Sequence, residues 1–283
     1  MLPNYFLIQR SLPFCSFITT FCIVMTLLIF STDFRSRYYR SYNRSLVYDF
    51  ESYMQESPFV VTSIQAGFIK PPRPRLQNVT VLKPNTPKVL LTAFKHKKGG
   101  IFIECGGGLV SDTLWLEKFW GWRGLITQPH PEDYDALAAS GRKRAHTARV
   151  CISPTIYPTH ATFKQTSRAE EGRTTVIPCF PLYSLIQAYN ASSVDLLILN
   201  VVSKHYHQVL KTIPVGKISI SVIGFVLKDS DDSFEGDDDP CCSEGIEEFL
   251  SKWGYKRLTD CPTSEISCYF SCKSPTHCPT VED

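Results

Sequence analysis

The sequence predicts an α/β protein built as a three-layer sandwich, with a mostly parallel seven-stranded sheet that follows one membrane-spanning helix. Residues 101–127 read as strand, glycine turn, helix and strand, the alternation typical of a parallel sheet. Apolar strands at 194–201 and 217–227 flank a further helical segment. Residues 11–32 carry no charge and are long enough for a transmembrane helix, which needs about 20 apolar residues.

The elements follow in order from the apolar pattern. The run Ile101–Ile103 begins the first strand, and Ser111 is a suitable N-cap for the first helix. The last two strands are expected to form an antiparallel hairpin. Residues 154–178 lack clear periodicity. We expect strands near 100–105, 124–128, 148–152, 194–201, 217–227, 255–260 and 265–271, and helices near 111–120, 131–140, 181–190, 203–212 and 243–253.

The glycine turn is the first candidate for a ligand site. Gly106, Gly107 and Gly108 directly follow the first strand. Because they lack side chains, the backbone there can turn sharply and approach a ligand closely. The spacing indicates a site for a nucleotide-type cofactor.

Several motifs resemble the FkbM-type methyltransferase family: SDTLWLE at Ser111–Glu117, GWRGL at Gly121–Leu125, PHP at Pro129–Pro131 and VDLLILNV at Val194–Val201. The similarity extends roughly from Gly99 to Cys272. It implies a Rossmann-like class I methyltransferase fold at residues 85–283. It also implies an S-adenosylmethionine site formed by Glu104, Gly106, Gly107, Gly108, Gln128 and Asn200.

The chain departs from the family where the chemistry should be. The glycine loop is shorter and has lost the Asp-Gly-Glu of the family. Gln128 replaces the carboxylate that would bind the ribose hydroxyls, and Asn200 replaces the aspartate that ends a later strand. Glu104 remains, although a carboxylate at a strand end is often simply solvated. A neutral amide cannot act as a general base or attract a cationic sulfonium.

These departures favour a pseudoenzyme with no cofactor and no assignable catalytic residue. The alternative is an S-adenosylmethionine-dependent O-methyltransferase that acts in the secretory lumen on a glycan or a small hydroxylated substrate. Cofactor binding distinguishes the two readings.

The N-terminus predicts a cytoplasmic tail at residues 1–10, a signal anchor at 11–32 and a basic luminal stem, rich in Pro and Tyr, at 33–84. A cleavable signal peptide ending at Ser31 is the rival interpretation. The positive-inside rule opposes a luminal domain, because Arg35, Arg37, Arg40 and Arg44 follow the span and only Arg10 precedes it.

Cysteines and glycosylation sequons favour the secretory lumen. The chain has 11 cysteines, and the late set lacks the paired Cys-x-x-Cys spacing of a zinc site. Sequons occur at Asn43, Asn78 and Asn190. The disulfide candidates are Cys241, Cys242, Cys261, Cys268, Cys272 and Cys278.

Charged and histidine-containing segments indicate no further site. The acidic run 229–239 fails the EF-hand register, since Cys242 falls where a glutamate is required, so we expect a solvated loop and no metal. The run Arg142–Arg144 is also expected to be solvated, and a net charge of +3 does not indicate nucleic-acid binding. His205 and His207 lie two residues apart, so on a helix they would point to different sides.

A short tail, one span, a basic stem and a degenerate FkbM-like domain together resemble the Star-like animal branch of that family. The resemblance implies a type II membrane protein of the endoplasmic reticulum, Golgi, endosomes or plasma membrane, with its C-terminal domain luminal or extracellular. It also implies an escort function, in which the partners are the membrane and a protein cargo such as a membrane-tethered growth-factor precursor.

Overall fold

The computed structural model describes residues 20–26, 50–72, 90, 93–95, 97–108, 112–164, 174–201, 205–214, 216–227, 244–258 and 266–272. The chain divides into two compact units, Met1–Asp49 and Phe50–Asp283.

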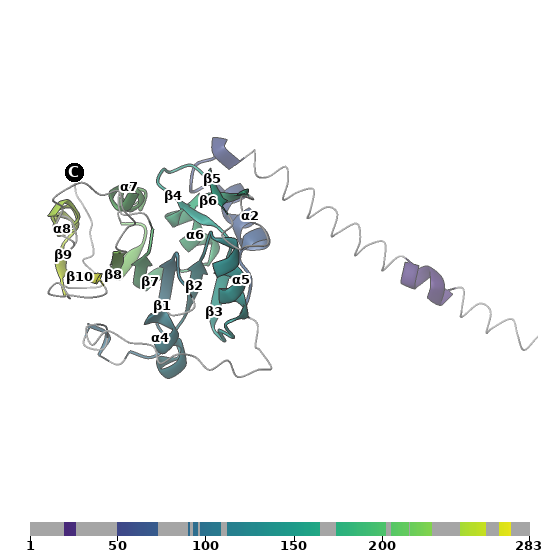
Figure 1. Cartoon of the computed structure of the whole chain (residues 1–283), viewed down its shortest axis with the longest axis horizontal. Coiled ribbons are helices and arrows are strands. Elements are labelled where there is room, and N and C mark those ends of the chain that lie inside the picture. The colour runs from purple at the N-terminus through teal and green to yellow at the C-terminus, as the bar shows by residue number, and fades with distance from the viewer. Residues whose placement is uncertain are drawn as a thin grey trace, which may run out of the picture. The chain divides into compact units, whose positions relative to one another are not determined.

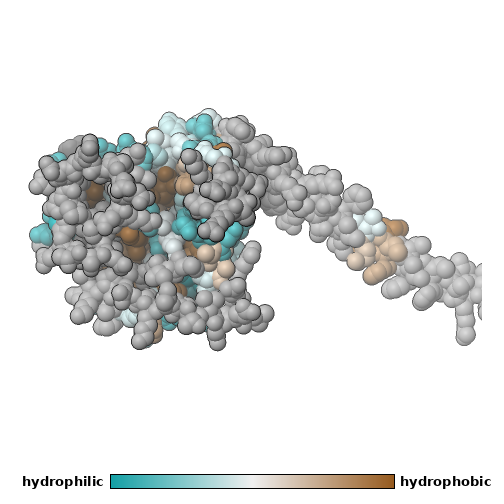
Figure 2. Space-filling view, in the orientation of Figure 1, coloured by the Kyte–Doolittle hydropathy of each residue, from teal (hydrophilic) through white to brown (hydrophobic). Residues whose placement is uncertain are grey.

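In the first unit, residues 20–26 are helical and lie inside the predicted span 11–32. The helix exposes apolar side chains on its surface (Figure 2), namely Phe21, Ile23, Val24 and Met25. Across the described ranges, no helix has both the length and the apolar character needed to cross a membrane. The remainder of the predicted span lies outside those ranges.

The second unit contains the predicted large sheet (Figure 1). Its strand order is β3-β2-β1-β7-β8-β10-β9. All neighbouring pairs are parallel except those of β10, which runs antiparallel to both β8 and β9. The seven-stranded, mostly parallel sheet with a late antiparallel hairpin is therefore confirmed. The strands are β1 (Ile101–Cys105), β2 (Arg123–Thr127), β3 (Ala145–Ala148), β7 (Ser193–Leu199), β8 (Ser219–Leu227), β9 (Tyr255–Arg257) and β10 (Ile266–Cys272).

Five helices connect these strands at the predicted positions. Local chemistry explains where they begin: α5 has Pro131 in its first turn, where the missing amide costs nothing, and carboxylates at Glu132 and Asp133 favour the positive end of the helix dipole. The helices are α4 (Asp112–Trp120), α5 (Pro131–Ala139), α6 (Leu182–Ala188), α7 (Tyr206–Lys211) and α8 (Glu244–Lys252).

Helices bury both faces of the large sheet, as a parallel sheet requires. On one face, Phe102, Leu196 and Ile198 form a core with Leu116 of α4 and Leu137 of α5. Strand residues alternate between faces, so Phe225 points to the other side, where the ring of Tyr206 on α7 meets it edge-on at 5.0 Å. The strands are consequently held rigidly from both sides.

A second, three-stranded sheet lies where the sequence showed no periodicity. Its order is β4-β6-β5, formed by β4 (Cys151–Ser153), β5 (Thr159–Lys164) and β6 (Thr174–Pro181). The predicted single strand at 148–152 is wrong, because β3 ends at Ala148 against β2 and β4 pairs with β6 instead. Apolar spacing cannot tell which of two sheets a strand joins.

The N-terminal segment of this unit belongs to the fold and not to a stem. It forms η1 (Phe50–Ser52), α2 (Pro58–Ser63) and the π-helical turn η2 (Ile64–Phe68). Phe50, Val60 and Ile64 are buried, and Ser184 of α6 donates a hydrogen bond to the Gln55 carbonyl at 2.6 Å. The predicted boundary at residue 84 therefore lies too late for residues 50–72, whose apolar side chains complete the core.

Candidate functional site

The strand order fixes where a ligand crevice can form. From β1 the chain builds the sheet outward through β2 and β3, and then crosses back to β7 on the other side of β1. Ligands of open α/β sheets bind at this switch point, beyond the carboxyl ends of the strands. The predicted cofactor residues Gly106–Gly108, Gln128 and Asn200 follow β1, β2 and β7, so the fold brings them to this edge, whereas Glu104 lies within β1.

The glycine loop that follows β1 is held close to its neighbours. Gly106 has φ of 77°, and both Gly106 and Gly107 donate backbone hydrogen bonds to the Thr127 carbonyl at 2.8 and 3.1 Å. A Cβ on Gly106 would lie 2.1 Å from the Asn200 carbonyl oxygen, and one on Gly107 would lie 2.6 Å from the Glu104 carboxylate. A Cβ on Gly108 would meet nothing within 4 Å. Gly106 and Gly107 are thus required by packing, whereas Gly108 is not.

Gln128, at the carboxyl end of β2, is bound to the backbone at both ends of its amide. Its Nε2 donates to the Gly107 carbonyl at 3.0 Å, and its Oε1 accepts from the His130 amide at 3.1 Å. The residue is buried, with 7% of its surface exposed. Gln128 therefore links the glycine loop to the start of α5.

Asn200, at the carboxyl end of β7, makes the equivalent contact from the other side. Its Nδ2 donates to the Gly106 carbonyl at 2.9 Å, and its backbone amide donates to the Cys105 carbonyl at 2.8 Å. Two consecutive glycine carbonyls are thus each bound by a side-chain amide. We call Gln128 and Asn200 the amide pair.

Glu104 lies beneath the glycine loop and does not face solvent. Only 4% of its surface is exposed, and Thr113 of α4 donates a hydrogen bond to its carboxylate at 2.5 Å. The expectation of a solvated carboxylate is therefore wrong. Glu104 anchors the start of α4 to β1, since β1 is otherwise apolar and the carboxylate needs a buried partner.

A buried ion pair extends this network. Arg142 Nη1 lies 3.2 Å from Thr113 Oγ1 and 3.3 Å from Glu117 Oε2, and Glu117 also accepts the backbone amides of Lys143 and Arg144. The prediction that Arg142 is solvated is wrong: 4% of it is exposed. Sequence reasoning missed this cluster, although Thr113 and Glu117 are four residues apart and so share a helix face.

Cys105 is buried and carries no disulfide. Burial raises the pKa of its thiol from 9.0 to about 12; a hydrogen bond with Thr127 lowers it, and the charge of Glu104 raises it. A thiol with so high a pKa is protonated at neutral pH and is a poor nucleophile. Cys105 is therefore a packing residue at the carboxyl end of β1.

The cofactor that the fold family implies is S-adenosylmethionine, which presents ribose hydroxyls and a cationic sulfonium. Three of the predicted cofactor positions do not fit it. The amide pair is neutral and donates to the glycine loop, and the one predicted carboxylate, Glu104, lies under that loop. Gln128, Asn200 and Glu104 therefore supply neither an exposed carboxylate for the ribose nor a base for proton removal.

The remaining predicted site residues lie elsewhere. His205 contacts Gln208 at 2.9 Å while the ring of His207 packs on Phe249 of α8, so the two histidines do point to different sides. Asn190 is exposed. Within the described ranges, no group of three or more His, Cys, Asp or Glu side chains could hold a metal ion. Outside the described residues or side chains lie Asn43, Asn78, the run 229–239 and Cys241, Cys242, Cys261, Cys268, Cys272 and Cys278.

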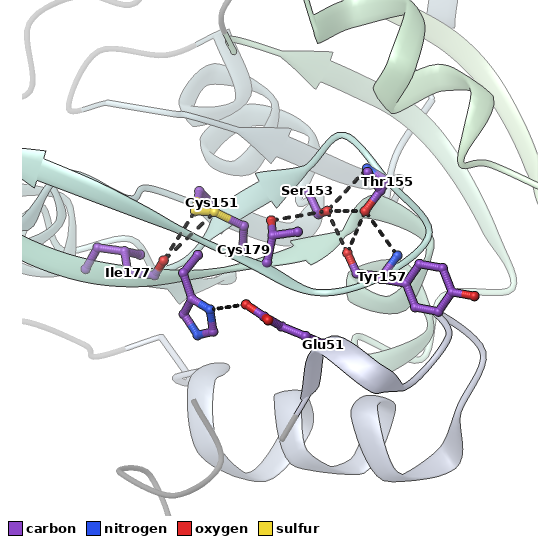
Figure 3. The surroundings of a disulfide bond; sticks show 9 residues. Glu51, Cys151, Ser153, Thr155, Tyr157, Ile177 and Cys179 are labelled. Carbon is purple, nitrogen blue, oxygen red and sulfur yellow. Dashed lines mark hydrogen bonds and ion pairs between the residues drawn. A yellow bond between two sulfur atoms is a disulfide. The ribbon is translucent and has the colours of Figure 1, made fainter. Parts of the chain in front are cut away.

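A disulfide joins Cys151 on β4 to Cys179 on β6 (Figure 3), across 28 residues of sequence. The two residues face each other in the register of the parallel strands. Near it, the carboxylate of Glu51 lies in hydrogen-bond contact with Nδ1 of His160 on β5 at 2.9 Å, which links η1 to the second sheet. This disulfide was not among the predicted candidates, because the sequence offered only a cysteine count and no pairing signal.

No family model matches the chain, and no curated protein matches it significantly. Several solved structures are similar to this chain at low identity. The METTL16 MTase domain is 14% identical, with a TM-score of 0.40, covering 76% of this chain and 79% of that one. The precorrin-6y C5,15-methyltransferase from Geobacter metallireducens is 11% identical, with a TM-score of 0.37, covering 69% and 91%.

MtNAS in complex with MTA and tNA is 10% identical, with a TM-score of 0.34, covering 66% of this chain. The present chain spans 58% of the length of MtNAS. At such identities and scores these structures decide nothing about activity. The architecture rests on the strand order itself, which is that of a seven-stranded, largely parallel α/β sheet.

Proposed function

We propose that this chain is a type II membrane protein of the secretory pathway whose methyltransferase-like domain is a non-catalytic scaffold that escorts a membrane-tethered growth-factor precursor. The observation that carries the proposal is the amide pair. Gln128 and Asn200 donate to the carbonyls of Gly107 and Gly106 at 3.0 and 2.9 Å.

The amide pair removes the two functions that methyl transfer would require at this edge. A carboxylate at the end of β2 would accept hydrogen bonds from ribose hydroxyls, and an acidic group near the end of β7 would favour a cation. A neutral amide provides no negative charge, and an amide that donates to the loop carbonyls lowers the mobility of the loop. The crevice thus serves as a rigid joint between β1, β2 and β7.

An oxidising compartment is supported by the disulfide between Cys151 and Cys179, because disulfides persist mainly in secreted and luminal domains. The exposed sequon at Asn190 is consistent with the same compartment. The anchor rests on the uncharged segment 11–32, of which residues 20–26 form an exposed apolar helix. The class of cargo rests on the Star-like resemblance.

The escort function is tested by following a cargo through the secretory pathway. The full chain is co-expressed in animal cells with a membrane-tethered precursor of the epidermal-growth-factor type. Export is measured as the fraction of precursor whose glycans resist endoglycosidase H. A matched cargo control keeps the transmembrane helix of the precursor but lacks its growth-factor module.

We expect the full chain to raise the resistant fraction of the intact precursor and to leave the control cargo unchanged. An equal effect on both cargoes would indicate a general effect on export and would contradict specific escort. No effect on either cargo, with the chain itself properly located, would reject the proposed cargo class.

A further inference from the structure

A groove lies at the end of the sheet opposite the crevice. It has a volume of about 470 Å³, within the range of about 300–1,000 Å³ typical of small-molecule sites. Val61 and Thr62 of α2 form one wall and Gln187 of α6 another, while Asn190 lies on the loop before β7. The groove is therefore lined both by the N-terminal segment and by the body of the domain.

Asn190 is placed by the way α6 ends. It has φ of 59° and donates its amide to the Gln187 carbonyl at 2.8 Å, while the amide of Ala191 donates to the Ile186 carbonyl at 3.2 Å. These two bonds form a Schellman motif, in which the residue after the helix is left-handed and is usually Gly or Asn. The motif turns Asn190 outward at the edge of the groove.

The groove offers both the apolar and the polar contacts that a sugar makes with a protein. The side chain of Val61 supplies an apolar wall for C–H groups, and the pair formed by Lys217 and Glu56 at 2.7 Å supplies exposed polar atoms. Gln187 of α6 also lines the groove, and its side-chain oxygen is itself buried.

We infer that Asn190 carries an N-linked glycan whose innermost N-acetylglucosamine lies in this groove and braces α2 against α6. The inference rests on the luminal location in the proposed function. The glycan would cover polar and apolar surface that belongs to two different parts of the chain. It would thus stabilise the attachment of residues 50–72 to the domain.

The sequon and the helix end can be separated by mutation. Ser192→Ala removes the sequon and leaves Asn190 in place. Asn190→Gly also removes the sequon, but glycine adopts positive φ without steric strain. Asn190→Ala removes the sequon and disfavours the left-handed conformation. The full chain and each variant are produced in animal cells, and glycan occupancy is measured by mass spectrometry at Asn43, Asn78 and Asn190.

The rate of backbone amide hydrogen exchange at residues 58–63 then shows whether the glycan stabilises α2. We expect Asn190 to be occupied, and exchange in α2 to be roughly threefold faster in both Ser192→Ala and Asn190→Gly, as expected when a local contact is lost. Exchange that is faster only in Asn190→Ala would assign the effect to the helix end and overturn the inference.

The occupancy pattern distinguishes failure of this inference from failure of the proposed function. Glycans at Asn43 or Asn78 with none at Asn190 would overturn the inference and leave the luminal location intact. A chain with no glycan at any of the three sequons would contradict the luminal location as well. If Asn190 is glycosylated but hydrogen exchange in α2 is unchanged in both sequon variants, the glycan does not stabilise α2 and the inference is overturned.

Discussion

The side-chain amide of Asn200 donates a hydrogen bond to the carbonyl oxygen of Gly106 at 2.9 Å. Gln128 makes the same bond to the next carbonyl, that of Gly107, from the opposite side of the crevice. The glycine loop would approach a cofactor, and the amide pair occupies the positions that would recognise that cofactor. The amide pair therefore hydrogen-bonds the glycine loop itself. This arrangement explains how neutral amides can replace carboxylates without leaving buried polar groups unsatisfied.

Replacing Gln128 with glutamate should destabilise the domain by about 1–3 kcal/mol, because the donor to Gly107 is lost and a carboxylate then faces a carbonyl oxygen. Urea unfolding measures the change. Gln65→Glu, the same substitution at an exposed position, is the matched control and should stay within about 0.5 kcal/mol of wild type. Equal unfolding free energies for the two variants would show that the Gln128 contact contributes nothing.

Arg142→Met should cost about 3–5 kcal/mol, since it leaves the buried carboxylate of Glu117 without its cation. Lys252→Met removes the cation of an exposed pair with Glu248 and should change stability far less, because solvent screens that pair. Chemical denaturation of both variants gives the comparison. A loss at Arg142 as small as that at Lys252 would argue against a buried ion pair.

The double variant Cys151→Ala, Cys179→Ala should lose roughly 3–4 kcal/mol, the value expected when a cross-link closing a loop of this length is removed. Unfolding is measured without reductant, so that any other disulfides stay intact. Peptide mapping of the non-reduced wild-type protein should recover the two cysteines in one linked species. Recovery of both as free thiols would contradict the assignment.

The thiol of Cys105 makes stability depend on pH in the alkaline range. Its pKa is raised from 9.0 to about 12 in the folded protein. The folded state therefore binds more protons than the unfolded state above pH 9, so this contribution to stability is complete below that pH and declines above it. Between pH 8 and pH 10 the wild type should lose about 1.4 kcal/mol more than Cys105→Ala.

Differential measurement against Cys105→Ala isolates this thiol. Burial also raises the pKa values of Tyr206 and Tyr255, but both variants retain these tyrosines. A stability difference between wild type and variant that does not change from pH 8 to pH 10 would rule out a buried thiol at this position.

The order of helices and strands could be predicted because periodicity is a local property. The run Ile101–Ile103, the glycines after it and the helix 112–120 each follow from neighbouring residues. The second sheet could not be predicted in the same way, because β4 joins β6 through a long-range pairing that leaves no periodic signal.

The convergence of these positions at one edge of the sheet could be predicted, but their hydrogen-bond partners could not. Positions after three strand ends identify Gly106, Gln128 and Asn200, whereas the direction of each amide depends on which carbonyl lies within reach. Burial of Glu104 and Arg142 was missed for a related reason. Charged side chains are usually exposed, so the sequence predicts solvent exposure unless the buried partner is known. Composition likewise assigned residues 50–72 to a stem, although three of their apolar side chains are buried.

Calorimetric titration of S-adenosylmethionine into the glycosylated full chain measures whether the proposed scaffold binds this cofactor. We expect no binding heat and no change in Tm with about 1 mM cofactor in a sample that unfolds cooperatively. Micromolar binding would add roughly 4 kcal/mol at that concentration and raise Tm by roughly 8 °C or more. Such a result would contradict the scaffold and support a luminal methyltransferase.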